Sequence, residues 1–195
     1  NLIHTAIIPI GSMHITNDIA IGLRCTIDTA EKVKTLYGQA SPALVDKLAE
    51  IDMSKIDPEE ETRVSQQMVA EMIEARLEEI FDRLTAELKR IERDGKLPAG
   101  IVLTGGGAAL PGVVEFAKHY LRLPVSIGVP SETDTIIDQV VDPSFATVVG
   151  LSLWGSNFTG SFSDFSFTKP FRAIGGLLEN DNMVKLKKWF KTIMP

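Results

Sequence analysis

Three consecutive glycines are the first residues of this chain that could hold a ligand: Gly105, Gly106 and Gly107. They follow a short apolar run at residues 101–103 and precede Pro111, where we expect a helix to begin. Residues without a Cβ allow a flat or anionic ligand to lie against the main chain, and the first N–H groups of the helix would point at it. A tight strand-to-helix turn without a ligand explains the glycines equally well. Their spacing matches neither the dinucleotide fingerprint nor a P-loop.

A carboxylate and an ammonium, Glu31 and Lys34, lie three residues apart and would share one face of a helix. We expect that helix to begin with Asp28 as its N-cap and to end at Gly38. A carboxylate accepts hydrogen bonds from hydroxyls such as those of ribose, and an ammonium donates to polar atoms of a nucleotide. A surface ion pair that contributes only about 0.2–0.5 kcal/mol explains the spacing as well.

Residues 183–195 combine apolar and basic side chains in a helical period. At 100° per residue the apolar side chains fall within an arc of about 140°; they are Met183, Leu186, Trp189, Phe190, Ile193 and Met194. The basic side chains take the opposite side; they are Lys185, Lys187, Lys188 and Lys191. Lysines without acids, aromatic residues on the apolar face and a Gly- and Ser-rich stretch before them predict a helix that lies in a membrane surface. A terminal helix packed on the protein core is the alternative.

The elements that would position these groups alternate between strands and helices. We expect a strand at residues 2–10, a helix led by Thr16 or Asn17, an irregular or β-rich insert at 41–60, and one long amphipathic helix at 59–93. A strand at 101–103, the helix after the glycines, a second strand at 124–127 and a helix with Asp142 as its N-cap complete the pattern. This order predicts an α/β fold.

The composition is that of an ordinary folded protein, with 195 residues of which 44% are hydrophobic. A net charge of −6 argues against nucleic-acid binding, which depends on lysine and arginine at the phosphates. Cys25 is the only cysteine and the three histidines lack metal-ligand spacing, so we expect no metal site built from them. No apolar run reaches the length of about 18 residues that a spanning helix needs. Because the chain opens on Asn1 inside an expected strand, we expect a fragment that lacks its N-terminal part.

Three motifs together resemble the C-terminal half of the FtsA family, the bacterial cell-division members of the actin/Hsp70-like ATPase superfamily. The first spans residues 8–23 and contains His14-Ile15-Thr16-Asn17-Asp18. The second, Ala30-Glu31-x-x-Lys34, is similar to the Glu and Lys that actin-like folds place on the ribose and base. The third, Thr104-Gly105-Gly106-Gly107 with Leu110-Pro111-Gly112, is similar to the superfamily's adenosine motif. The first motif and the basic terminus are specific to FtsA, and the other two are shared across the superfamily.

This resemblance implies half of an actin-like (ribonuclease H-like) ATPase fold, namely lobe 2 with a C-terminal amphipathic helix. Subdomain 2A would comprise residues 1–23 and 96–155, and subdomain 2B residues 24–95 with the long helix. Residues 156–182 would form a flexible linker to the membrane-targeting helix at 183–195. The superfamily's phosphate loop and other lobe have no match here. We therefore expect half of an ATP site, with Mg²⁺ bound mainly by the missing part.

The resemblance also implies a function: an adaptor that binds ATP, polymerises into actin-like filaments and tethers the tubulin-like protein FtsZ to the membrane. It would act on the cytoplasmic face of the inner membrane at the division site. Glu31 and Lys34 would contact the adenosine opposite the glycine turn. We expect weak or no ATPase activity and no role as a metabolic enzyme. A PilM-like pilus-assembly adaptor and another superfamily ATPase, such as a sugar kinase, are the alternatives.

The FtsZ C-terminal tail is expected on subdomain 2B, near the start of the long helix. The resemblance implies the region, and the chemistry of arginine selects Arg63 and Arg76 within it. A guanidinium can hold a carboxylate through two parallel hydrogen bonds. The alternative for each arginine is an ion pair with one of the many glutamates of its own helix.

Overall fold

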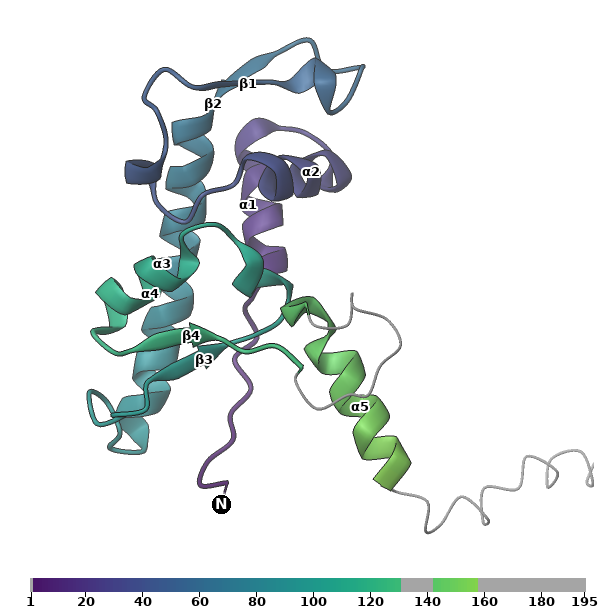
Figure 1. Cartoon of the computed structure of the whole chain (residues 1–195). Coiled ribbons are helices and arrows are strands. Elements are labelled where there is room, and N and C mark those ends of the chain that lie inside the picture. The colour runs from purple at the N-terminus through teal and green to yellow at the C-terminus, as the bar shows by residue number, and fades with distance from the viewer. Residues whose placement is uncertain (1, 131–141, 158–195) are drawn as a thin grey trace, which may run out of the picture. The chain divides into compact units, whose positions relative to one another are not determined.

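The computed structural model describes residues 2–130 and 142–157 (Figure 1). Its helices are α1 (Ser12–Leu23), α2 (Ile27–Tyr37), α3 (Gln66–Arg90), α4 (Val113–Leu121) and α5 (Ala146–Asn157). Its strands are β1 (Glu50–Asp52), β2 (Arg63–Ser65), β3 (Ile101–Leu103) and β4 (Val125–Ile127). Short 3₁₀ turns are η1 (Pro42–Leu44), η2 (Met53–Lys55), η3 (Gly106–Ala109) and η5 (Pro143–Phe145). The chain divides into two compact units, Asn1–Gly150 and Leu151–Pro195, and the description of the second covers only the end of α5.

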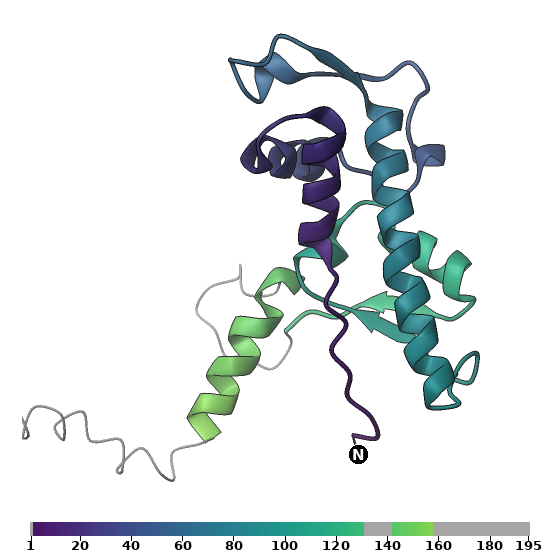
Figure 2. The same ribbon diagram turned by 180° about the vertical axis from the view of Figure 1, so that it is seen from behind.

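The long helix α3 packs against α1, which lies beside it in both opposite views (Figures 1 and 2). Helix α2 packs in turn on α1. Side chains from all three helices meet in the core without any exposed area; they are Ile19, Val33, Val69 and Ile73. The buried residues Ile15 and Ile19 of α1 are four positions apart, as are Val69 and Ile73 of α3, so each helix presents one buried stripe.

Strands β3 and β4 are parallel, with Ile101 opposite Val125, and α4 connects them. Helix α4 packs against α3 through three aromatic rings. The ring centroids of Phe81 and Phe116 lie 6.0 Å apart, and those of Phe116 and Tyr120 lie 5.8 Å apart. Both strands, expected at 101–103 and 124–127, are confirmed. Strand β3, helix α4 and strand β4 therefore form a β–α–β segment that packs on the helical layer through α3.

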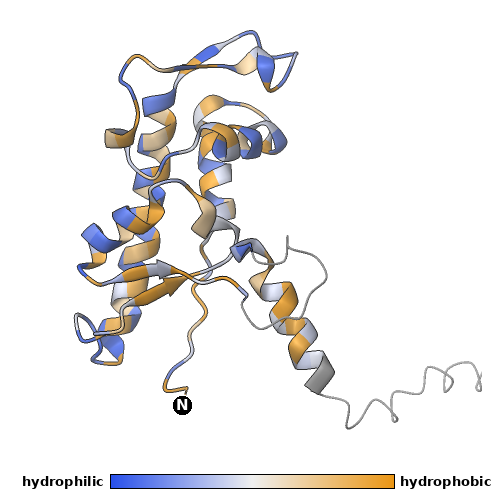
Figure 3. Ribbon diagram, in the orientation of Figure 1, coloured by the Kyte–Doolittle hydropathy of each residue, from blue (hydrophilic) through white to orange (hydrophobic). Residues whose placement is uncertain are grey.

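The N-terminal segment differs from the expectation of a strand at residues 2–10. The described residues 2–10 pair with no strand, and Leu2 and Ile7 are 87% and 92% exposed. Figure 3 shows that much of this segment is hydrophobic. A strand is defined by hydrogen bonds to a neighbour, and no neighbour for it lies within 2–130 or 142–157. The sequence pattern of residues 2–10 was therefore insufficient to predict a strand.

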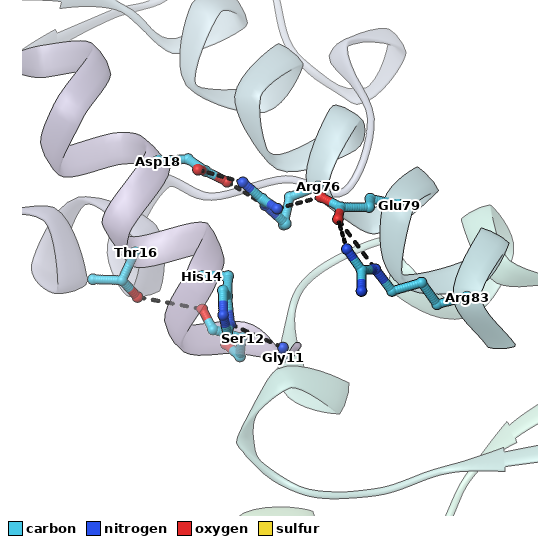
Figure 4. Close-up of polar contacts among 8 residues, drawn as sticks. All are labelled: Gly11, Ser12, His14, Thr16, Asp18, Arg76, Glu79 and Arg83. Carbon is cyan, nitrogen blue, oxygen red and sulfur yellow. Dashed lines mark hydrogen bonds and ion pairs between the residues drawn. The ribbon is translucent and has the colours of Figure 1, made fainter. Parts of the chain in front are cut away.

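Helix α1 begins at Ser12, before the expected start at Thr16 or Asn17. The Nδ1 atom of His14 accepts a hydrogen bond from the backbone N–H of Gly11 at 3.2 Å, which closes the first turn. Figure 4 shows this contact. Ile15 and Ile19 of this helix are buried.

Two further helix starts differ from the sequence-based expectation. Thr26, not Asp28, is the N-cap of α2, because its hydroxyl accepts the N–H of Thr29 at 3.1 Å. Helix α3 was expected from residue 59, but residues 63–65 instead pair with β1 as β2, and Ser65 is the N-cap. The end of α2 at Gly38 is confirmed.

Asp142 has the expected capping role. Its carboxylate accepts the N–H of Ser144 at 2.8 Å, at the start of η5, which leads directly into α5. The helix continues to Asn157. Most of the expected linker, residues 158–182, and the expected membrane helix, residues 183–195, lie outside the described residues. Within the described ranges, no helix is both long and apolar enough to cross a membrane.

Candidate functional site

The glycine turn after β3 has a backbone conformation that requires a glycine at its first position. Gly105 has φ +89° and ψ 170°, a combination that other residues rarely adopt. Its N–H donates to the carbonyl of Pro143 at 2.9 Å, and the hydroxyl of Thr104 donates to the carbonyl of Gly128 at 2.9 Å. The N–H of Gly105 is therefore already used by the protein. These bonds fix the turn to the residues that follow β4 and to η5.

Gly107 brings the turn into contact with the start of α1. A Cβ on Gly107 would lie 3.1 Å from the Cβ of Ser12, which is closer than side chains normally pack. Gly106 is less restricted, because the nearest atom to a Cβ there would be the Cβ of Ser144 at 3.9 Å. The three glycines therefore have different physical roles: an unusual backbone conformation, an ordinary turn position and a close approach.

The expected helix does not follow the glycines directly. The 3₁₀ turn η3 comes first, and α4 begins at Val113, with Gly112 as N-cap at φ +81°. The N-terminal residues of α4 do not line the pocket described below. That the N–H groups of α4 point at a ligand on the turn stays a prediction. The chain between β3 and α4 needs these residues to turn, which delays the helix.

A pocket of about 180 Å³ lies between this turn, the start of α1 and the face of α2. Its lining residues are Ser12, Ile15, Lys34, Thr35, Gly106, Gly107, Ala109, Leu110 and Pro111. Two groups that are far apart in the sequence, Lys34 and the glycine turn, thus face the same space. Of the residues expected at the site, Glu31 and Gly105 do not line the pocket itself.

The side chain of Lys34 is only 11% exposed and connects α2 to α1. Its ammonium donates to Glu31 Oε2 at 2.6 Å, to Thr16 Oγ1 at 2.8 Å and to Ser12 Oγ at 3.2 Å. The alternative of a simple surface ion pair therefore does not describe Lys34, because all three of its protons are bound and two of the bonds cross to the neighbouring helix.

Glu31 lies at the edge of this network, with 45% of its side chain exposed. Partial burial alone would raise the pKa of Glu31, but the hydrogen bonds from Lys34 and Thr16 and the charge of Lys34 outweigh it and lower the pKa. Both bonds go to Oε2. Within the described part of the chain, Oε1 has no hydrogen-bond donor, so this oxygen is available to a ligand.

Ser12 and Thr16 were not expected at the site from the sequence. Thr16 is fully buried, and its hydroxyl donates to Glu31 Oε2 at 2.5 Å. One signal in the sequence could have identified it, because a threonine next to Ile15 in the buried stripe of α1 must find hydrogen-bond partners there. Ser12 gave no such signal.

The two arginines expected to hold an acidic tail have different surroundings. Arg63 on β2 is 70% exposed and forms a loose ion pair with Glu50 of the neighbouring strand at 3.6 Å. Arg76 on α3 is 24% exposed and binds Asp18 of α1 and Glu79 of its own helix (Figure 4). The alternative of a pair within the helix thus accounts for only one of the two partners of Arg76. Arg63 is the more accessible guanidinium.

The described residues contain no group of three or more histidine, cysteine, aspartate and glutamate side chains that could hold a metal ion. The apolar and basic residues expected at a membrane surface, from Met183 to Lys191 and beyond, lie outside the described ranges. The geometry of the candidate site is therefore that of the pocket and of the polar network beside it.

Comparison with known proteins gives a consistent family. The model of the family "Cell division protein FtsA" matches residues 1–150. The chain is 38% identical to cell division protein FtsA of Pseudomonas aeruginosa, over 95% of this chain and 44% of the relative. It is 34% identical to FtsA of Neisseria meningitidis, over 96% of this chain and 45% of the relative. The chain thus spans less than half the length of these relatives.

Two solved structures share the fold. They are crystal structures of MreB 5 of Spiroplasma citri, one bound to AMPPNP and one bound to ADP, with TM-scores of 0.54 and 0.56. The first is 20% identical and covers 77% of this chain and 45% of its own; the second is 19% identical and covers 80% and 47%. At this identity the likeness shows the fold alone, which is part of an actin-like α/β fold.

Proposed function

The chain belongs to the FtsA family of cell-division proteins, and we propose that it forms the adenosine-binding part of an actin-like adaptor in cell division. In this proposal the adaptor assembles into filaments and ties FtsZ to the cytoplasmic face of the membrane at the division site. Family membership favours this function over the pilus-assembly and sugar-kinase alternatives.

One observation carries the nucleotide proposal: Lys34 and the glycine turn line the same pocket. Adenosine would lie there between the turn and the face of α2. The apolar side chains of Ile15 and Leu110 suit the faces of a purine ring, and the free Oε1 of Glu31 suits a ribose hydroxyl. The nucleotides bound in the two MreB structures, AMPPNP and ADP, agree with a nucleotide in this fold.

The residues present fit the nucleoside better than the phosphates. Within the described ranges, Lys34 is the only ammonium that lines this pocket, and its protons are already bound by Glu31, Thr16 and Ser12. The same ranges contain no group of three or more histidine, cysteine, aspartate and glutamate side chains that could hold a metal ion. We therefore assign the triphosphate and its Mg²⁺ mainly to parts of the full-length protein outside this chain.

The test is nucleotide binding to the full-length protein, measured by calorimetry with ATP. Lys34→Ala removes the buried ammonium and should weaken binding about tenfold, or roughly 1.4 kcal/mol. The control is Lys32→Ala, an exposed lysine of the same helix that does not line the pocket, which should bind as the wild type does. Equal affinity of the Lys34→Ala variant and the wild type would place the nucleotide elsewhere.

A second measurement tests the division of the site between two parts of the protein. The 195-residue chain alone should bind ATP weakly, because it holds the nucleoside pocket without a phosphate loop. Binding tighter than about 1 μM, near −8.2 kcal/mol, would contradict the half-site proposal.

The adaptor role needs two further surfaces. For the FtsZ tail we propose β2 and the start of α3, where Arg63 is exposed and forms a loose ion pair with Glu50 at 3.6 Å. Arg76 would join only if its bonds to Asp18 and Glu79 opened. For the membrane we propose residues 183–195, on the strength of their apolar and basic faces. Filament formation by self-association follows from the actin-like fold as a proposal of the same kind.

A further inference from the structure

Thr16 is a buried polar residue at the point where α1 meets α2. The residue has no exposed area, and its neighbours Ile15 and Ile19 on α1 are also buried. Its Oγ1 donates to Glu31 Oε2 at 2.5 Å and accepts from Lys34 Nζ at 2.8 Å. One hydroxyl thus touches Lys34, which lines the pocket, and Glu31, which lies at the edge of the polar network, without lining the pocket itself.

We propose that Thr16 is a positioning residue for nucleotide binding: it holds the Glu31 carboxylate and the Lys34 ammonium in the orientation that the nucleotide meets. This inference rests on the proposed nucleotide site. Thr16 lies on α1, whereas Glu31 and Lys34 lie on α2. It touches no ligand and acts only through this pair.

A purely structural role would not require these bonds. The backbone carbonyl of Ser12, one turn earlier on α1, lies 3.4 Å from the Thr16 hydroxyl and could satisfy it locally (Figure 4). The bonds to α2 are shorter, at 2.5 and 2.8 Å, and lead to the two ionised groups. Hydrogen bonds to ionised groups are the stronger kind. The hydroxyl is therefore directed to the pair and not to its own helix.

Removal of the hydroxyl should loosen both partners. Lys34 would keep Glu31 and the more distant Ser12 Oγ at 3.2 Å, and its flexible four-carbon chain could then rotate away from the pocket. Glu31 would lose one of the two hydrogen bonds that lower its pKa, so its pKa would rise toward the ordinary value. Nucleotide affinity should consequently fall and should weaken further at acidic pH.

The experiment compares Thr16→Val and Thr16→Ser in the full-length protein, with a fluorescent ATP analogue as the probe. Valine keeps the shape and removes the hydroxyl, and it should raise the dissociation constant by about fivefold, near 1 kcal/mol on the scale of tenfold per 1.4 kcal/mol. Serine keeps the hydroxyl and should restore wild-type binding. The loss of affinity on acidification should also begin at a higher pH in Thr16→Val than in the wild type.

Thr29→Val is the matched control. Thr29 is 2% exposed and donates to Asp57 at 2.9 Å, so the change also removes a buried hydroxyl, but it does so away from the pocket lining. Its nucleotide affinity should equal that of the wild type. If Thr16→Val does not fold, Thr16→Ala removes the hydroxyl without filling the space and replaces it in the comparison.

Wild-type affinity in the Thr16 variants without a hydroxyl would overturn the positioning role, and so would an equal loss in Thr29→Val. The Lys34→Ala variant separates this failure from that of the proposed site. If Lys34→Ala weakens binding and Thr16→Val does not, only the role of Thr16 is wrong. If neither variant changes affinity, the nucleotide does not bind in this pocket.

Discussion

The guanidinium of Arg76 donates two hydrogen bonds to the carboxylate of Asp18, from Nε to Oδ2 at 2.5 Å and from Nη2 to Oδ1 at 2.7 Å. The two side chains are 24% and 26% exposed and belong to α3 and α1. The hydrogen bond to Asp18 is the main reason that the pKa of Arg76 is raised above its usual range. This ion pair connects α3 to α1, the helix that starts at the pocket.

Arg76→Lys should destabilise the protein, because an ammonium keeps the charge but cannot form the two parallel bonds to Asp18. We expect the free energy of unfolding to fall by about 1–2 kcal/mol, measured by urea denaturation. Arg83→Lys is the control, because Arg83 is 51% exposed and pairs only with Glu79 among the described residues. Its effect should stay below about 0.5 kcal/mol. Equal losses of stability in the two variants would mean that the contact between α1 and α3 does not depend on the two parallel hydrogen bonds of Arg76.

Arg63→Glu should weaken binding of an FtsZ tail peptide by about tenfold, because it replaces an accessible guanidinium with a repelling carboxylate. Arg90→Glu is closely matched: Arg90 is 72% exposed and pairs at 3.6 Å with Glu87, whereas Arg63 is 70% exposed and pairs at 3.6 Å with Glu50. Peptide affinity by fluorescence anisotropy should change only for Arg63→Glu. A similar loss of peptide affinity in both variants would mean that the change in net charge, and not Arg63 itself, causes the loss.

Alanine substitutions should separate the roles of the glycines. Gly105→Ala should cost about 1–3 kcal/mol of stability, because its φ of +89° with ψ 170° is essentially restricted to glycine. Gly106→Ala should be nearly neutral, since its Cβ would meet only Ser144 at 3.9 Å. Thermal denaturation of the two variants is the measurement. A neutral Gly105→Ala would show that the turn relaxes without strain.

The lowered pKa of Glu31 gives a stability that depends on pH. Its network stabilises the folded state fully above the unfolded-state pKa, about 4.3, and this contribution is lost as the pH falls through the lower folded-state pKa. The stability advantage of the wild type over Glu31→Gln should therefore be constant near neutral pH and shrink below about pH 4.3. Urea denaturation at several pH values measures it. An advantage that grew toward acidic pH would have the wrong sign.

Deletion of residues 183–195 should abolish co-sedimentation with anionic liposomes, because it removes the aromatic and basic side chains together. Trp189→Glu should have the same effect, since it places a carboxylate on the apolar face. Binding of the intact chain should weaken at high salt as the lysine contribution is screened. A truncated chain that still sediments with liposomes would exclude this segment as the membrane site.

Local patterns predicted the part of the fold that depends on local chemistry. The strand at 101–103, the turn and the strand at 125–127 follow from a short apolar run, glycines and a second apolar run. The segment at residues 2–10 has a comparable pattern but no strand partner in the described part of the chain. Pairing is a property of two segments, so one segment could not predict it.

The candidate site was predictable only in part from the sequence, which did not identify Ser12 or Thr16. Glu31 and Lys34 were selected by spacing and resemblance, and the structure brings Lys34 to the glycine turn. Their contacts with Thr16 arise from the packing of α1 on α2, which no spacing encodes. The same holds for Arg76, whose main partner lies on α1 and not on its own helix. Long-range pairing of this kind needs the tertiary structure.

The sheet formed by β3 and β4 has a consequence for work with the purified chain. Among the described residues β3 is paired on one edge only, and its Val102 is 63% exposed. An open strand edge with exposed apolar side chains is a template for non-native association between molecules. Light scattering or pelleting of the isolated chain would therefore record association through open strand edges in addition to any assembly of the proposed kind, and an added charge such as Val102→Lys should suppress the association through strand edges.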